Sequence, residues 1–176
     1  MKTTKLKIIA VLVIMAIGYS FTSLGKITIK GSDTMVILSQ QWAEIYMKKN
    51  PGTVIQVTGG GSGVGLAALI NGSTDIANSS RPIKPAELEK IKAKFGKNAI
   101  QIPCAKDGLS VFLNKGNKVS ELTIAQIGGI FSGKITNWKQ VGGDDAKIQL
   151  YGRESSSGTF EFFKEHVVQT DFAATC

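Results

Sequence analysis

Short runs of β-branched and apolar residues alternate along the chain with longer stretches in which apolar residues recur at helical spacing. This alternation is typical of an α/β protein whose sheet strands are joined by crossover helices. The expected strands cover 26–30, 53–58, 75–78, 100–103, 109–113 and 147–151. The expected helices cover 35–49, 64–70, 85–95, 123–131 and 159–168. We therefore predict an α/β fold.

The helix expected over 35–49 has a clear amphipathic pattern. Its apolar residues Met35, Leu38, Trp42 and Ile45 fall on one side of a 3.6-residue period, together with Tyr46. This spacing predicts that these side chains face the sheet. An Asn-Pro-Gly sequence directly after the helix is a strong stop signal.

The first 25 residues have the pattern of a secretory leader. Lys2, Lys5 and Lys7 precede a ten-residue apolar run, 8–17, and small and polar residues follow it up to Gly25. The run is shorter than the roughly 20 residues of a membrane span, so a cleaved signal peptide is favoured over an uncleaved anchor. Cleavage is expected after Gly25. No cysteine follows the run, so no lipoprotein anchor is expected and the predicted location is the periplasm.

The charge balance favours a small anionic ligand over a nucleic acid. Removal of the three leader lysines from 21 basic residues leaves 18, against 13 acidic residues, so the mature chain carries a net charge of +5. The lysines are scattered, and no basic stretch is interleaved with aromatic residues, so no nucleic-acid partner is expected. A moderately basic surface still attracts small anions.

Metal binding and disulfide bonding have little support in the sequence. One histidine and two cysteines leave no set of ligands for a zinc site, so no metal or other cofactor is expected. Cys104 follows a proline in an apolar setting and is expected to be buried. Its pairing with Cys176 stays open, because spacing alone does not decide it.

The chain after the leader divides into two expected lobes. Lobe I covers 26–105 and lobe II covers 106–176, with the boundary near Lys106. Only eight residues follow the last expected helix, which is too few to complete a second lobe with its own buried sheet. We therefore expect lobe II to be truncated.

Three turns that directly follow expected strands have the same chemistry. They are the sequences GSDT at 31–34, GGGSG at 59–63 and SSSGT at 155–159. Each places hydroxyl groups and unhindered backbone N–H groups at the start of a helix, where the helix dipole favours an anion. The carboxyl ends of parallel strands meet at one edge of a sheet, so the turns can converge. Arg153 adds a charge-assisted donor.

Each turn taken alone is an ordinary helix cap, but the three together favour a binding site. The consecutive glycines at 59–61 are costly in backbone entropy and indicate that something approaches the main chain there. Nucleotide-binding fingerprints are not matched, and Val64 breaks the hydrolase pattern around Ser62. His166 stands nine residues after Ser157 inside a helix, which disfavours it as a general base.

Six segments in order resemble the phosphate-binding protein of the bacterial high-affinity phosphate ABC importer. They are GSDTM at 31–35, GGGSGVGLAAL at 59–69, ANSSRPIK at 77–84, DGLSVFLN at 107–114, IFSGKITNWKQVGG at 130–143 and GRESSSGTFEFF at 152–163. The resemblance covers about 27–168, nearly all of the mature chain.

The resemblance implies a type II periplasmic-binding-protein fold, with two α/β lobes and a ligand cleft between them. It also implies that the chain returns to lobe I after lobe II, so lobe I is expected to be incomplete without that return. The implied function is capture of inorganic phosphate by a monomer and its delivery to the membrane permease of an ABC importer. No enzymatic activity and no cofactor are implied.

The family pattern also implies a set of ligand-binding residues. Carried over position by position, it comprises Thr34, Met35, Ser62, Arg153, Ser157, Gly158 and Thr159. Apart from Met35, which enters through its amide, these residues belong to the three turns or add the guanidinium beside them.

Two positions depart from the family pattern. Ser80 stands where many members have an aspartate that accepts the proton of monohydrogen phosphate, and Ser155 stands where some members have an aspartate that pairs with the arginine. The Ser80 hydroxyl can also accept a hydrogen bond from this phosphate proton, but more weakly than an aspartate. Without an acceptor, the protonated phosphate would be a buried, unpaired donor, which costs ~1–3 kcal/mol. Arg81 either contacts the anion directly or lies at the surface or pairs with Glu154. We therefore keep Ser80 and Arg81 as candidate phosphate ligands.

Three alternatives remain open beside phosphate transport. Without the family aspartate, sulfate or arsenate is a possible ligand. A secreted phosphatase would use Ser157 or Ser62 as nucleophile, but the sequence supplies no obvious base or metal beside either serine. A surface adhesion or sensory module would keep the fold without transport.

Overall fold

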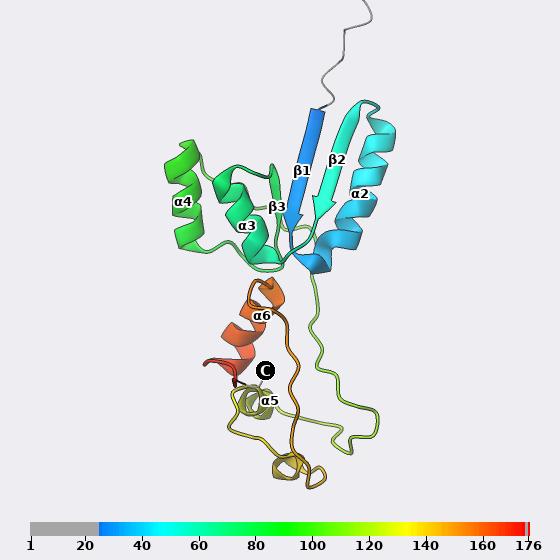
Figure 1. The fold of residues 1–176 in the computed structure, drawn as a ribbon, viewed down its shortest axis with the longest axis vertical. Helices are drawn as coiled ribbons and strands as arrows, with labels where there is room; N and C mark the ends of the chain where they lie inside the picture. The colour runs from blue at the N-terminus through cyan, green and yellow to red at the C-terminus, as the bar shows by residue number, and fades with distance from the viewer. Residues whose placement is uncertain (1–24, 175) are drawn as a thin grey trace, which may run out of the picture.

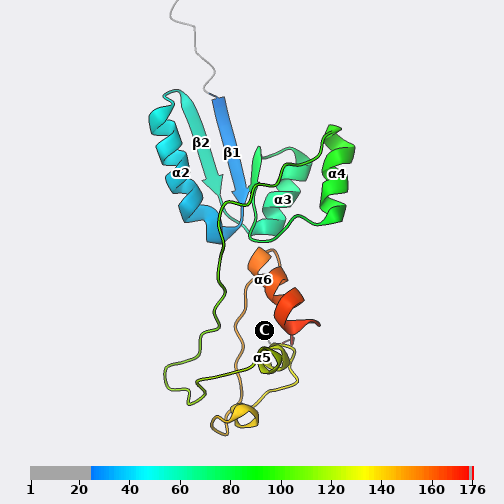
Figure 2. The same cartoon turned by 180° about the vertical axis from the view of Figure 1, so that it is seen from behind.

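The computed structural model describes residues 25–174 and residue 176 (Figure 1). The expected leader therefore lies outside the described residues, apart from Gly25. Among the residues that the structure describes, no helix is both long and apolar enough to cross a membrane. The chain forms two bodies, which we call the sheet region (25–96) and the helical region (117–148 and 157–174). Two extended connecting segments, 97–116 and 149–156, join them (Figures 1 and 2).

The sheet region contains a three-stranded parallel sheet with the order β2-β1-β3. Its strands are β1 (Gly25–Gly31), β2 (Thr53–Thr58) and β3 (Ile76–Asn78). β1 is central and pairs Ile27 with Ile55 of β2 and Ile29 with Ile76 of β3. The β-branched runs therefore form strands as predicted, and the parallel pairing with intervening helices confirms the α/β fold class.

The sheet region also contains three helices. They are α2 (Val36–Lys49), α3 (Ser62–Asn71) and α4 (Pro85–Phe95). α2 follows the short 3-10 turn η1 (Asp33–Met35) and packs beside β2, whereas α3 packs against β1, β3 and α4 (Figure 1). α3 and α4 both end at a glycine in the left-handed conformation, which is a common way to stop a helix.

The predicted inward face of α2 is only partly buried, because Met35 and Leu38 are half-buried but the other three side chains are exposed. Ser39 and Ala43 are the buried residues of this helix, whereas Trp42, Ile45 and Tyr46 are about half exposed. The Oγ atom of Ser39 accepts a hydrogen bond from the buried Asn78 side chain at the end of β3. The helix therefore lies against the sheet with a strip of small residues, and its larger apolar side chains fall on the neighbouring strip.

The helical region contains two short α-helices around an aromatic cluster. α5 (Ile124–Phe131) begins with a capping box, and α6 (Gly158–Phe163) continues directly into the π-helical turn η3 (Lys164–Val168). A 3-10 turn, η2 (Trp138–Val141), lies between them in the sequence. Phe131 of α5 packs edge to face on Phe163 of α6 with 4.9 Å between the ring centres. This contact holds the two helices together.

The strands predicted at 100–103, 109–113 and 147–151 are wrong as paired strands. In the described structure these segments are extended, and they form no sheet pairing beyond one isolated bridge between Lys147 and Asn137. A strand pattern forms a ladder only where a neighbouring strand is present. Phe112 accordingly stays 90% exposed, and Cys104, expected to be buried, is an exposed free thiol.

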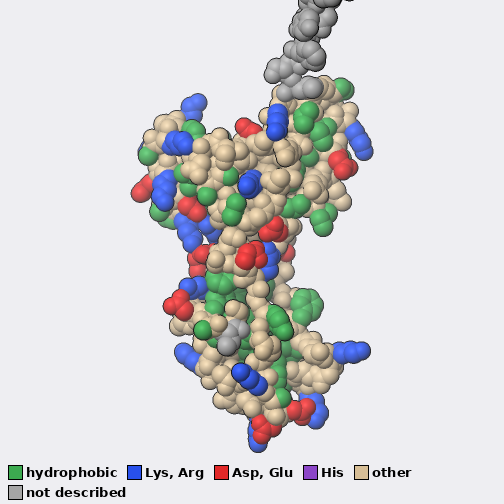
Figure 3. Space-filling model, viewed as in Figure 1, with side chains coloured by type: hydrophobic (Ala, Val, Ile, Leu, Met, Phe, Trp, Pro, Cys, Tyr) green, Lys and Arg blue, Asp and Glu red, His purple; other side chains and the backbone are tan. Residues whose placement is uncertain are grey.

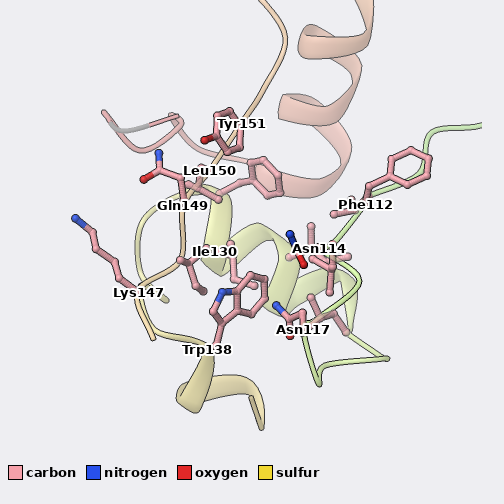
Figure 4. Close-up of a pocket in the computed structure, with 15 residues that line it drawn as sticks. Phe112, Asn114, Asn117, Ile130, Trp138, Lys147, Gln149, Leu150 and Tyr151 are labelled. Atoms are coloured by element: carbon pink, nitrogen blue, oxygen red, sulfur yellow. The ribbon is translucent and has the colours of Figure 1, made fainter. Parts of the chain in front are cut away.

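An apolar cavity of about 360 Å³ lies between the two extended connecting segments (Figure 4). Val111 and Leu113 line one side of it, and Ile148 and Leu150 line the other. Figure 4 shows Trp138 and Ile130 beneath these segments. The helical region thus has helices and a partial core, but no sheet among the described residues.

Candidate functional site

The candidate site lies where the sheet region meets the start of α6. β1 and β2 run parallel and point their carboxyl ends toward α6 (Figure 1). The three Ser- and Gly-rich turns predicted to converge are all found at this junction, which holds the loops after β1 and β2 and the loop before α6. Parallel strands place the loops after them at one edge, which explains the first two.

The first turn is fastened to the end of β3. Ser32 is 2% exposed, and its backbone N–H donates to the carbonyl of Asn78 at 2.9 Å. The hydroxyl groups of Ser32 and Thr34 lie 2.8 Å apart and share a hydrogen bond. The backbone N–H of Met35 donates to the carbonyl of Ser32 at 3.2 Å, so this predicted anion donor already has a partner within the turn.

The second turn makes direct contact with the third. Gly60 and Gly61 have φ values of 115° and 90°, which favour glycine. A Cβ atom on Gly61 would lie 2.5 Å from the carbonyl oxygen of Ser156, so a side chain does not fit. The backbone N–H of Gly63 donates to that same carbonyl at 3.0 Å. The group that approaches the glycine main chain is therefore another turn of this chain.

Three loops meet in a compact cluster that contains the side chains of Ser62 and Ser80 and the main chain of Gly158. Ser62 is fully buried, its Oγ atom accepts from the backbone N–H of Ser80 at 3.0 Å, and the two hydroxyl oxygens are 3.2 Å apart. A Cβ atom on Gly158 would lie 2.4 Å from the Ser62 hydroxyl and 2.5 Å from the Ser80 hydroxyl. Ser157 is 2% exposed and caps α6 by accepting from the backbone N–H of Phe160. Thr159 follows within the first turn of α6.

Arg153 lies at the rim of this junction between two carboxylates. Its Nε and Nη2 atoms donate to Glu154 at 3.1 and 2.8 Å, and Nη2 also lies 3.3 Å from Asp33. The hydrogen bonds from Arg153 lower the pKa of Glu154, and Glu154 and Asp33 raise the pKa of the guanidinium. Within the described residues its Nη1 atom has no hydrogen-bond partner, so one edge of the guanidinium remains available to an anion.

The Arg81 side chain is largely buried and pairs with Glu87 of α4. Two of its nitrogens donate to the two carboxylate oxygens of Glu87 at 3.0 and 2.8 Å, and one also donates to the Pro82 carbonyl. Its side chain is 8% exposed. The hydrogen bonds between the two side chains lower the pKa of Glu87 and raise that of Arg81. The alternative pairing of Arg81 with Glu154 is therefore wrong.

The Nε atom of Arg81 is buried without a hydrogen-bond partner among the described residues. A buried unpaired donor is unfavourable, so this atom is the part of Arg81 that a ligand or a water molecule would satisfy.

Two ion pairs cross from the sheet region to α6 or to the connecting segment before it. One joins Arg153 to Asp33, and the other joins Lys84 to Glu161 of α6 at 2.5 Å. Figure 3 shows acidic and basic side chains together at the narrow waist between the two bodies. The three Ser- and Gly-rich turns thus lie at a junction where the side-chain contacts that join the bodies include ion pairs.

The donor chemistry of the junction suits an oxyanion. Hydroxyl groups, backbone N–H groups and one guanidinium edge are hydrogen-bond donors. In the part of the chain that the structure describes, no group of three His, Cys, Asp or Glu side chains is placed to hold a metal ion. His166, on η3, contacts Phe162 through its ring and its Nδ1 atom and does not reach Ser157.

Sequence analysis assigned no role to Asp33, Glu87 or Ser156. Glu87 carries a local signal, because it stands three residues after Lys84 at the start of α4, the capping-box position. Asp33 stands inside the first turn, but its contact with Arg153 spans 120 residues and has no local signature. Ser156 acts through its backbone carbonyl, which residue type does not reveal.

Comparison with known proteins finds a family match over nearly all of the described residues. Residues 20–175 match the family model of a PBP superfamily domain. The chain is 35% identical over 156 residues to the phosphate-binding protein PstS of Pseudomonas aeruginosa, covering 82% of this chain and 48% of that protein. It is 38% identical over 144 residues to PstS of Bacillus subtilis, covering 82% and 46%. The chain spans about half the length of the curated relatives it matches.

Solved structures show the same likeness. A putative phosphate ABC transporter substrate-binding protein from Clostridium perfringens with bound phosphate matches with a TM-score of 0.72 and 35% identity, over 85% of this chain and 58% of that one. An ABC-type phosphate transport receptor from Vibrio cholerae matches with a TM-score of 0.64 and 35% identity, over 86% and 62%. The match of the family model over nearly the whole chain, together with the α/β fold, establishes that this protein belongs to the PBP superfamily.

Proposed function

We propose that the protein binds inorganic phosphate at the junction between the sheet region and α6 and delivers it to the permease of an ABC importer. One observation carries the proposal: the loops after β2 and β3 and the loop before α6 bring Ser62, Ser80 and Gly158 into contact, with the free edge of Arg153 at the rim. The names of the relatives support phosphate as the ligand.

The physical basis is recognition of an oxyanion by neutral donors and one cation. Hydrogen bonds to a charged acceptor contribute about 1.5–3 kcal/mol each, roughly twice the value for neutral pairs. The start of α6 adds the favourable field of a helix N-terminus, since α6 and η3 form one continuous helical stretch. The proposed ligands are Thr34, Met35, Ser62, Ser80, Arg81, Arg153, Ser157, Gly158 and Thr159.

We also propose where the protein acts and in what form. The protein is secreted through its leader to the periplasm, acts as a monomer, and binds its ligand between lobes covering 26–105 and 106–176. It binds phosphate without transforming it, because neither Ser62 nor Ser157 has a histidine or carboxylate partner among the described residues. The relatives support this role, as substrate-binding components of transporters.

Isothermal titration of the purified protein with phosphate, sulfate and arsenate at neutral pH tests the proposal. Phosphate is expected to bind, and Arg153→Ala is expected to weaken it about ten- to hundredfold, the equivalent of one charge-assisted hydrogen bond. Lys118→Ala is the matched control, because it removes one positive charge and an exposed ion pair with Asp144 in the helical region. It is expected to leave the affinity within about twofold.

Three results would overturn the proposal. Binding of sulfate alone would assign another oxyanion. Full phosphate affinity in Arg153→Ala would remove the proposed site. Steady hydrolysis of p-nitrophenyl phosphate that is lost in Ser157→Ala would assign a phosphatase.

A further inference from the structure

Asp33 connects three parts of the junction through one carboxylate. Its Oδ1 atom accepts from the backbone N–H of Gly60 at 2.8 Å, and its Oδ2 atom lies 3.3 Å from Nη2 of Arg153. The contact with the glycine turn is close, since a Cβ atom on Gly59 would lie 2.2 Å from Oδ1. Asp33 therefore reaches from the turn after β1 both to the turn after β2 and to the segment before α6.

The two carboxylates that contact Arg153 belong to different parts of the chain. Glu154 is the next residue of the same connecting segment, so its contact moves with Arg153. Asp33 belongs to the sheet region, so its contact exists only while Arg153 is held against that region. The Nη1 edge remains without a partner among the described residues while both carboxylates are engaged.

We propose that Asp33 is a positioning residue of the anion site, which holds Arg153 against the glycine turn from the opposite side of the junction. This inference rests on the proposed phosphate-binding function. An anion that binds between the two bodies needs them together, and a contact present only in that arrangement increases the population of the competent state. Asp33 thereby strengthens anion binding through Arg153, although its own charge repels an anion.

The sign of the effect makes the inference testable. If Asp33 acted only as a negative charge near the ligand, its neutralisation would tighten phosphate binding. If Asp33 positions Arg153, neutralisation weakens binding. Asp33→Asn separates the two roles, because the amide oxygen still accepts from Gly60 while the ionic contact with Arg153 is lost.

The matched control is Glu154→Gln. It removes the same unit of charge from the same guanidinium but breaks no contact between the two bodies. Phosphate affinity is measured by isothermal titration, and the association and dissociation rate constants by stopped-flow mixing. Exposed ion pairs contribute ~0.2–1 kcal/mol, so Asp33→Asn is expected to bind phosphate about 1.4- to fivefold more weakly, through faster dissociation. Glu154→Gln is expected to bind as tightly as the wild type or more tightly.

A double variant tests whether Asp33 acts through Arg153. Adding Asp33→Asn to Arg153→Ala is expected to cause no further weakening, since the group that it positions is already absent. An equal shift of affinity in Asp33→Asn and Glu154→Gln, in either direction, would overturn the inference. So would a further weakening in the double variant. Absence of phosphate binding by the wild type would overturn the proposed function itself, and the inference with it.

Discussion

The sheet region and the part of the chain that follows it, residues 97–174, respond differently to the same kind of sequence signal. In the sheet region, β-branched runs pair into three parallel strands because each finds a neighbour within the chain. The segments at 109–113 and 147–151 also have strand patterns, yet apart from the isolated bridge at Lys147 they remain unpaired on either side of an apolar cavity. A strand pattern therefore indicates that a segment can pair, but a ladder forms only where a partner strand lies beside it.

Hydrogen exchange should show the largest difference between the two regions. Backbone amides in β1 that bond to β2 and β3 are expected to exchange about a thousandfold more slowly than amides at 109–113, because a paired amide exchanges only after local opening. Exchange measured by mass spectrometry on peptides from both segments checks this. Equal protection of 109–113 would show that this segment has a partner and would remove the contrast.

The Arg81–Glu87 pair should be a major source of stability in the sheet region. Glu87→Gln is expected to lower the free energy of unfolding by roughly 3 kcal/mol, because it leaves the buried Arg81 guanidinium without its counter-charge. Urea unfolding can be followed region by region, since Trp42 lies in α2 and Trp138 in η2. The loss is expected in the Trp42 signal, in a Trp138→Phe background.

The same pair should make stability depend on pH in the acid range. The pKa of Glu87 is lower in the folded protein, so the folded state binds fewer protons and stability rises with pH through this window. The stabilisation is complete above the ordinary glutamate pKa of about 4.3 and is lost as the pH falls through the lowered value. The difference in unfolding free energy between wild type and Glu87→Gln should therefore shrink below about pH 4.3. A difference that stays constant with pH would contradict this origin.

Leu66 is a buried apolar residue of the sheet region, whereas Phe112 is an exposed apolar residue of the connecting segment 97–116. Leu66 of α3 is 4% exposed, so Leu66→Ala is expected to cost at least about 2 kcal/mol of stability through lost burial and a cavity. Phe112 is exposed, so Phe112→Ala is expected to change stability by less than about 0.5 kcal/mol. Urea unfolding of both variants checks this. A large loss in Phe112→Ala would show that its segment is packed in solution.

The smallest effect is expected for the ion pair between the regions. Lys84 and Glu161 are both partly exposed, so their coupling should be ~0.2–1 kcal/mol. The single reversals Lys84→Glu and Glu161→Lys should each destabilise slightly, and the double reversal should recover most of the loss. A double-mutant cycle of unfolding free energies measures this coupling. A coupling of zero would mean that the pair does not link the two regions in solution.

Much of the candidate site could be predicted from local sequence. The three Ser- and Gly-rich turns follow from turn and capping chemistry. In the structure the second turn contacts the first through Gly61 and Gly31, and the third through Gly63 and Ser156. Ser80 lies in none of these turns and was proposed from the family pattern. Arg153 was also found from its place before the third turn. The partners of the two arginines could not be found in this way, because Asp33 and Arg153 lie 120 residues apart and Arg81 has several acidic neighbours to choose from.

Local sequence patterns account for the helices and for the turns that could cap a helix or bind an anion, because these features depend on neighbouring residues and on backbone conformation. Three further features required the folded structure: which strand patterns pair, which face of α2 is buried and which carboxylate contacts each arginine. These features depend on contacts between residues that are far apart in the sequence. For each of them, several partners of similar chemistry compete. The fold settles that competition by bringing one partner within bonding distance.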